Sequence, residues 1–233
     1  MAKLAEIRSK LTTLSFDCYG TLIDWETGIR VAFESLLDGS QGMPIDAPTL
    51  IEAYLETEAE IQDRGYRPYR KVQAAALLEV ARRFELTVPP QKVHILADSL
   101  PDWRPFIDTN AALLELKKRF RLGIVSNIDQ NLLEGTMRHL AVPFDFVITA
   151  EDVRAYKPSH PHFLRLLESV ADPLELLHVA QSVYHDGVPA TQLGLAWAWI
   201  NRKGEMNRTA GRPVLEARDL QQLVRELASI PQL

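Results

Sequence analysis

The stretch LTTLSFDCYGTL, residues 11–22, contains an apolar run that ends directly in Asp17. A short continuous apolar run is typical of a strand that is buried on both faces of a parallel sheet. In such sheets, ligands bind in the crevice at the carboxyl ends of the strands. We therefore expect Asp17 to face a ligand crevice, with Gly20 permitting a tight turn and the Thr21 hydroxyl close by. An aspartate in this position could also serve only as a turn former.

Four further apolar runs follow along the chain. They are residues 121–126, 144–149, 177–181 and 195–201. Between them lie stripes of apolar residues at three- and four-residue spacing, which predict helices. Strands that alternate with helices predict an α/β fold with a doubly wound parallel sheet.

Residues 22–98 break this alternation, because they carry helical patterns and no convincing strand. Thr49 with Glu52 is typical of a capping box, and Pro89 is expected to end a second helix. An insertion after the first strand of an open α/β sheet lies over the ligand crevice. We therefore expect a core domain and a helical cap domain; the core comprises residues 1–21 and 99–233 and the cap residues 22–98.

Composition excludes several classes of protein. The 233 residues carry 26 Lys and Arg against 31 Asp and Glu, a net charge of -5, so a nucleic-acid partner is not expected. No apolar run approaches the length of a membrane span, and the segment 1–10 is too polar for a signal peptide. We expect a cytoplasmic protein that acts on a small molecule. Its apolar cap helices could support a homodimer.

Polar residues also follow the next three predicted strands. Ser126 and Asn127 follow the second, Lys157 with Pro158 comes after the third, and Asp186 comes after the fourth. In this order and on these strands, the segments resemble the four motifs of the haloacid dehalogenase superfamily. The resemblance spans nearly the whole chain and implies that superfamily's Rossmann-like core with a cap after the first strand.

The resemblance also implies catalytic roles. Asp17 would attack the substrate and form a covalent ester, which water then cleaves. Lys157 would keep Asp17 ionised, and Ser126 and Asn127 would hydrogen-bond the substrate or the developing charge. Asp186 would orient or deprotonate the hydrolytic water. Thr21 completes this set of catalytic candidates.

Two positions indicate the branch of the superfamily. Phosphatases of this superfamily carry a second aspartate two residues after the nucleophile, where this chain has Tyr19. They also hold Mg²⁺ with an acid in the fourth motif, where this chain has Gln181. The resulting pattern is similar to the type II L-2-haloacid dehalogenases, in which a halide leaves without a metal or a general acid. We expect no cofactor, and Mg²⁺ only if the protein is a phosphatase after all.

The leaving group stays open at this point. The dehalogenases carry an arginine early in the cap that contacts the halide, whereas this chain has no arginine between Arg30 and Arg64. Residues 17–29 and 182–186 look similar to azetidine-2-carboxylate hydrolases, which open a strained four-membered ring. An amine leaving group needs a proton, which His185 or Tyr19 could supply.

Further residues are candidates for substrate binding. Arg64 and Arg67 lie close in sequence to Tyr69 and could grip a carboxylate, or could form a solvated basic turn. Trp25 could form a wall of the pocket or pack the core against the cap, and we also assign Gln181, His185 and Tyr19 to the binding set.

Three functions remain as alternatives. The first is a metal-independent hydrolase of a C–X bond in a small 2-substituted carboxylate. The second is a Mg²⁺-dependent small-molecule phosphatase, which metal dependence would distinguish. The third is a binding protein without catalysis, whose behaviour Asp17→Asn would leave unchanged.

Overall fold

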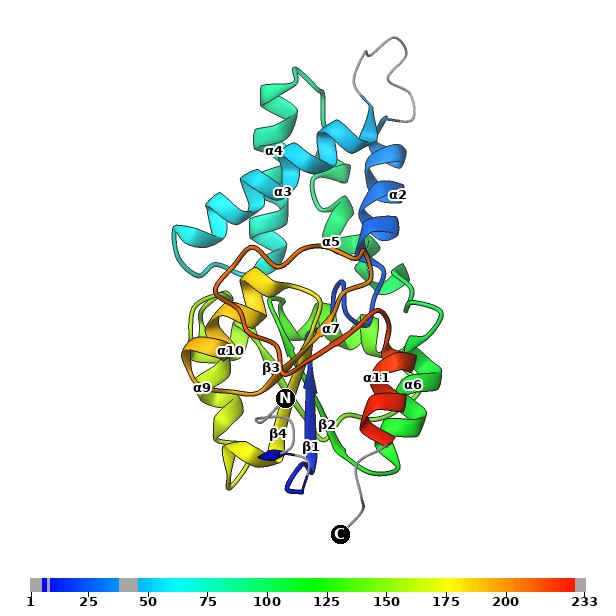
Figure 1. Ribbon diagram of the computed structural model, residues 1–233. Helices are drawn as coiled ribbons and strands as arrows, with labels where there is room; N and C mark the ends of the chain where they lie inside the picture. The colour runs from blue at the N-terminus through cyan, green and yellow to red at the C-terminus, as the bar shows by residue number, and fades with distance from the viewer. Residues whose placement is uncertain (1–5, 8, 38–45, 229–233) are drawn as a thin grey trace.

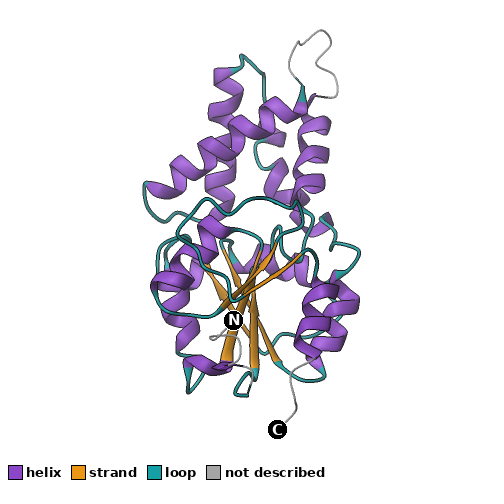
Figure 2. Cartoon of the chain, viewed as in Figure 1, coloured by secondary structure: helices purple, strands orange, loops and turns teal. Residues whose placement is uncertain are grey.

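A computed structural model of the chain describes residues 6–7, 9–37 and 46–228, and its centre is a parallel sheet (Figure 2). The strand order is β3-β2-β1-β4-β5-β6, and every neighbouring pair is parallel. The strands are β1 (Thr13–Phe16), β2 (Arg121–Ser126), β3 (Phe146–Thr149), β4 (Leu176–Ala180), β5 (Trp197–Ile200) and β6 (Leu215–Ala217). This is the expected doubly wound α/β fold.

Strand β1 lies at the middle of the sheet, because it pairs with both β2 and β4. Phe16 is level with Ile124 on one side and with Val179 on the other. All four residues of β1 are buried, which explains the continuous apolar run in the sequence. The residue after β1 is therefore held at the centre of the sheet's carboxyl edge.

Helices cover both faces of the sheet. In Figure 1, α6 and α11 lie on one side of it and α9 and α10 on the other. The core helices are α6 (Thr109–Lys117), α7 (Gln130–Met137), α8 (Ala150–Val153), α9 (Pro161–Leu167), α10 (Val188–Gln192) and α11 (Leu220–Ala228). Shorter turns are η3 (Pro173–Glu175), a 3₁₀ segment, and η4 (Val183–Gly187), a π-helical segment.

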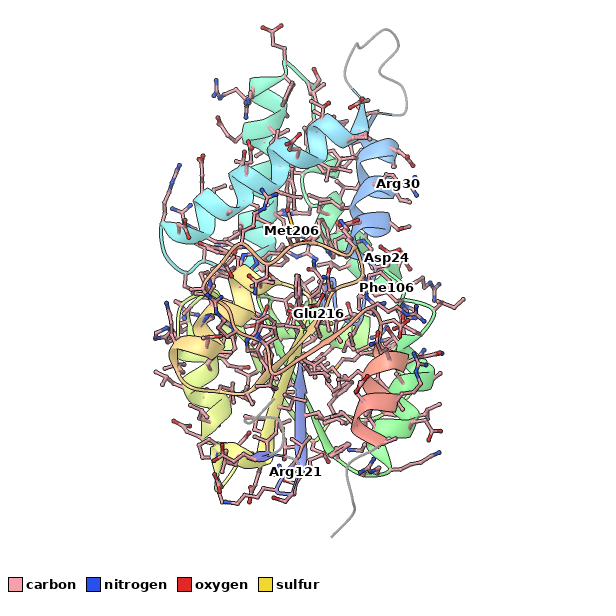
Figure 3. All side chains as sticks on the ribbon, viewed as in Figure 1. Asp24, Arg30, Phe106, Arg121, Met206 and Glu216 are labelled. Atoms are coloured by element: carbon pink, nitrogen blue, oxygen red, sulfur yellow. The ribbon has the colours of Figure 1, made fainter. Side chains whose placement is uncertain are left out.

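A helical cap follows β1 and stands over the carboxyl edge of the sheet (Figure 1). Its helices are α2 (Trp25–Leu37), α3 (Ala47–Asp63), α4 (Tyr69–Arg83), η1 (Pro90–Lys92) and α5 (Ile95–Ser99), and the short turn η2 (Leu100–Asp102) follows α5. The two chain segments that join cap and core pair with each other: Asp24 N donates to Arg104 O at 2.9 Å, and Phe106 N donates to Leu22 O at 3.0 Å. Figure 3 shows Asp24 and Phe106 together at the base of the cap.

Three local expectations were wrong. Strand β6 was missed because it has only three residues. The cap of α3 is Asp46, whose carboxylate accepts from Thr49 N at 2.9 Å, and not Thr49 with Glu52. Helix α4 ends at Arg83, well before Pro89. Glu85 has a φ of 56°, so the chain leaves the helix through a left-handed residue rather than at the proline.

None of the helices among the described residues is long and apolar enough to cross a membrane.

Candidate active site

Asp17 directly follows β1, and both of its carboxylate oxygens accept hydrogen bonds. Lys157 Nζ donates to Oδ1 at 2.8 Å, and Thr21 Oγ1 donates to Oδ2 at 2.8 Å. The Thr21 oxygen in turn accepts from the backbone N–H of Gln181 at 2.9 Å. Thr21 therefore links the loop after β1 to the loop after β4 and fixes the orientation of the Asp17 carboxylate.

Lys157 is almost completely buried and lies between two carboxylates. Its Nζ donates to Asp17 Oδ1 at 2.8 Å, to Asp186 Oδ1 at 2.7 Å and to the Val125 carbonyl at 3.0 Å. Burial lowers the pKa of Lys157, but the charges of Asp17 and Asp186 outweigh burial and hold the pKa above its usual value. The ammonium is therefore charged at neutral pH.

Asp186 is fully buried in η4, and one of its oxygens is free. Oδ1 accepts from Lys157 and from His178 Nε2, the latter at 2.9 Å, whereas Oδ2 has no hydrogen-bond partner among the described residues. Burial raises the pKa of Asp186, yet the Lys157 charge and the His178 hydrogen bond hold it well below its usual range. Asp186 is a carboxylate with an unused acceptor at the cavity wall.

A cavity of about 350 Å³ opens between the sheet edge and the cap. From the residues predicted as site members, ten line it: Asp17, Tyr19, Trp25, Tyr69, Ser126, Asn127, Lys157, Gln181, His185 and Asp186. Thr21 does not line the cavity, but its hydroxyl donates a hydrogen bond to Asp17. Most of the candidates therefore converge on one space.

Arg64 and Arg67 are not part of this convergence. Both are exposed and neither lines the cavity, and Arg64 forms a 3.5 Å ion pair with Glu60 on the outside of α3. The loop between α3 and α4 points these side chains into solvent, while the adjacent Tyr69 faces the cavity. Arg64 and Arg67 therefore form a solvated basic turn, which was one of the two expected alternatives, and they do not face Asp17.

The side-chain amide of Asn127 forms two hydrogen bonds with the backbone of Lys157. Its Oδ1 accepts from Lys157 N at 2.7 Å, and its Nδ2 donates to Lys157 O at 3.0 Å. This reciprocal pair occupies the amide group and fixes the loop that carries the lysine. The geometry favours a positioning task for the Asn127 amide.

The two proton-donor candidates are both neutral at pH 7. The Tyr19 hydroxyl is 2.8 Å from Thr136 Oγ1, and burial raises the pKa of Tyr19 well above its usual range. His185 Nδ1 lies 3.0 Å from Ser182 Oγ, and burial lowers the pKa of His185. Neither group replaces the second acid of the phosphatases.

The cap contributes polar residues that the sequence analysis missed. Tyr54, Glu58 and Gln62 from α3 and Gln73 from α4 line the cavity, together with Trp103 at its base. A signal for Glu58 exists in the sequence, because it falls between Tyr54 and Ile61 on the buried face of the helix, where a glutamate is unusual.

The donor set does not fit a divalent cation. Gln181 occupies the position where an acid would be needed, and the Lys157 ammonium already bonds both Asp17 and Asp186. In the described part of the chain, no three His, Cys, Asp or Glu side chains come together as a metal site would require.

Comparisons with known proteins identify the family. Residues 11–186 match the protein family described as haloacid dehalogenase-like hydrolase. The (S)-2-haloacid dehalogenase H-109 of Pseudomonas putida is 27% identical over 209 residues, which are 88% of this chain and 92% of that protein.

Solved structures show the same fold. One L-2-haloacid dehalogenase superposes with a TM-score of 0.79 at 26% identity, over 94% of this chain and 99% of its own. The L-2-haloacid dehalogenase of Xanthobacter autotrophicus, solved with chloropropionic acid covalently bound, gives a TM-score of 0.81 at 18% identity, over 95% of this chain and 100% of its own.

Proposed function

The chain belongs to the haloacid dehalogenase-like hydrolases, and on that premise we propose that it hydrolyses a C–X bond at carbon 2 of a small carboxylic acid. The observation that carries this proposal is the contact of Lys157 with Asp17, at 2.8 Å, beside a Tyr19 that keeps its proton. The site pairs its nucleophile with a buried ammonium and has no general acid in the phosphatase position. It suits a leaving group that departs without protonation.

In the first step, Asp17 supplies an electron pair. An oxygen of its carboxylate bonds to carbon 2 of the substrate while the C–X bond breaks, and X departs with the bonding pair as halide. The product of this step is an ester of Asp17. Thr21 and Lys157 hold the carboxylate in a fixed orientation, so little reorganisation is needed as the bond forms.

In the second step, water cleaves the ester. Its oxygen attacks the carboxyl carbon of Asp17, and the ester oxygen leaves with carbon 2 as a 2-hydroxy acid. One water proton ends on the product hydroxyl and the other is released to solvent, which restores the Asp17 carboxylate. The unpaired Oδ2 of Asp186 offers an acceptor that can orient this water.

A second candidate is the opening of a strained ring amine such as azetidine-2-carboxylate. The absence of arginine from the described cavity lining favours it, because no guanidinium is placed to receive a halide. In that reaction the C2–N bond breaks and a protonated ring nitrogen takes the electron pair, so it leaves as a neutral amine. No proton from Tyr19 or His185 is then needed at the moment of bond cleavage.

The test is turnover in H₂¹⁸O followed by mass spectrometry of the protein. The substrates are 2-chloropropionate, azetidine-2-carboxylate and a phosphate monoester, each with and without EDTA. We expect ¹⁸O in the peptide that contains Asp17, no effect of EDTA, and no turnover by Asp17→Asn. Asp63→Asn, an exposed position, serves as the control. Mg²⁺-dependent phosphate release as the main activity would overturn the proposal.

A further inference from the structure

The cap side of the cavity carries a carboxylate that the proposed chemistry does not use. Glu58 lies on α3 and accepts a hydrogen bond from the Tyr54 hydroxyl at 2.8 Å. Tyr69, from α4, also favours the ionised form of this carboxylate and lowers its pKa. Two phenols therefore lie beside the Glu58 carboxylate at the cavity wall.

Gln73 adds an acceptor without a partner. Its side chain is only 2% exposed and lines the cavity, and its Oε1 has no hydrogen-bond partner among the described residues. The Gln73 amide also favours the ionised form of Tyr54, the tyrosine that contacts Glu58. Gln73 and Glu58 are thus neighbours of the same tyrosine. Buried acceptors in native proteins are normally satisfied, so this pair points to an N–H donor that comes with a ligand.

The charge of the cavity also favours a ligand with a positive group. Its described lining contains three carboxylates, those of Asp17, Glu58 and Asp186, against the single ammonium of Lys157. No arginine lines it, and His185 is neutral at pH 7 because burial lowers its pKa. Burial also raises the pKa of Glu58, which means that its charge lacks a compensating cation. A ligand with a positive group would balance this excess of negative charge.

We propose that Glu58 and Gln73 form a subsite for an ammonium group of the substrate, on the cap side of the cavity and across from Asp17. The preferred substrate is then a 2-substituted carboxylic acid that is a zwitterion. This inference rests on the proposed function, because it places the cationic group relative to the carbon that Asp17 attacks. A displacement needs the nucleophile and the leaving group on opposite sides of that carbon, so a departing ammonium nitrogen fits on the cap side.

The test compares two ligands of nearly the same shape. Azetidine-2-carboxylate carries the ammonium group, and cyclobutanecarboxylate replaces it with CH₂. Their binding to the Asp17→Asn protein is measured by titration calorimetry, so turnover does not interfere. We expect azetidine-2-carboxylate to bind roughly 10- to 100-fold more tightly, as for a hydrogen bond to a charged group. Adding Glu58→Gln should remove most of this preference.

A matched control lies two residues along the same helix. Glu60→Gln makes the same change in charge on α3, but its side chain is 69% exposed and outside the cavity. It should keep the preference. Gln73→Leu is a second variant, expected to reduce the preference several-fold while leaving the charge unchanged. If Glu58→Gln does not fold, the result for Gln73→Leu alone tests the subsite.

The two proposals can fail separately. Equal affinity for both ligands in the Asp17→Asn protein would overturn the subsite, as would a preference that survives both Glu58→Gln and Gln73→Leu. An Asp17 ester formed from 2-chloropropionate by such a protein would still support the proposed hydrolysis. A preference that depends on Glu58 in a protein that never labels Asp17 would support the subsite as a binding site and refute the ester mechanism.

Discussion

The Nζ of Lys157 lies 2.8 Å from Oδ1 of Asp17, although 140 positions separate the two residues in the chain. Asp17 ends the central strand, and Lys157 reaches it from the loop after α8. The lysine also bonds Asp186, so one buried ammonium holds two carboxylates in place. This contact places a buried positive charge against the nucleophile and secures the junction of three loops.

Lys157→Met should therefore cost both stability and activity. Removing one partner of a buried ion pair leaves uncompensated charge and typically costs about 3–5 kcal/mol. We expect a loss of this order in urea unfolding and no measurable turnover. Lys10→Met is the control, because Lys10 and Asp172 are also 2.8 Å apart but their side chains are 51% and 37% exposed. That exposed pair should contribute at most about 1 kcal/mol. Equal losses for the two variants would contradict our account of Lys157.

Thr21→Val tests the second hydrogen bond to the nucleophile. Valine keeps the shape and removes the hydroxyl that donates to Asp17 Oδ2 and accepts from Gln181 N. We expect kcat to fall roughly tenfold and unfolding stability to fall by about 1–3 kcal/mol, since two buried groups lose their partner. Thr12→Val, at an exposed position before β1, should change neither quantity. Unchanged kcat in Thr21→Val would show that the orientation of Asp17 does not depend on this bond.

Gly28→Ala tests the wall of the cavity. A Cβ at Gly28 would lie 2.5 Å from the ring of Trp103, which lines the cavity and packs edge-on against Tyr19. Since Trp103 is only 6% exposed, its ring has little room to move. We expect a raised KM and a loss of stability of about 1–3 kcal/mol, typical of overpacking.

Arg30→Ala is the control for this prediction. Arg30 is exposed on the same helix as Gly28 (Figure 3), and its only described ion pair is the exposed one with Glu34. It should leave KM unchanged. A Gly28→Ala protein with normal KM and stability would show that the Trp103 ring can move aside at little cost.

His162→Leu should change how stability depends on pH. His162 is fully buried in α9, and burial together with the nearby Lys157 charge lowers its pKa to about 3. In the unfolded chain this imidazole takes up a proton near pH 6.5, whereas in the folded protein it stays neutral until about pH 3. The neutral imidazole therefore contributes to folding stability above pH 6.5, and this contribution is lost as the pH falls toward 3.

Between pH 7 and pH 4.5, the free energy of unfolding should therefore fall less in His162→Leu than in the wild type. Urea unfolding at the two pH values measures the difference. His94→Leu replaces an exposed histidine and should leave the pH dependence unchanged. Parallel pH profiles for wild type and His162→Leu would refute the assignment.

Local sequence rules predicted much of the core, for a physical reason. A strand that is buried on both faces needs a continuous apolar run, and the carboxyl ends of parallel strands meet at one edge. Asp17, Ser126, Lys157 and Asp186 could therefore be brought together from their order along the chain alone. The short β6 and the cap of α3 were missed because three residues or one side chain give little pattern to read.

The α/β core, the inserted helical cap and the polar residues at the strand ends could be predicted from local patterns along the chain. The residues on the cap side of the cavity became clear only from the packing of the folded chain. Arg64 and Arg67 stay in solvent, whereas Glu58 and Gln73, from two cap helices, both line the cavity. Periodicity shows that a helix has a buried face, but it does not show what that face meets. That depends on how the cap helices pack on one another and over the sheet, which involves contacts between residues far apart in the chain.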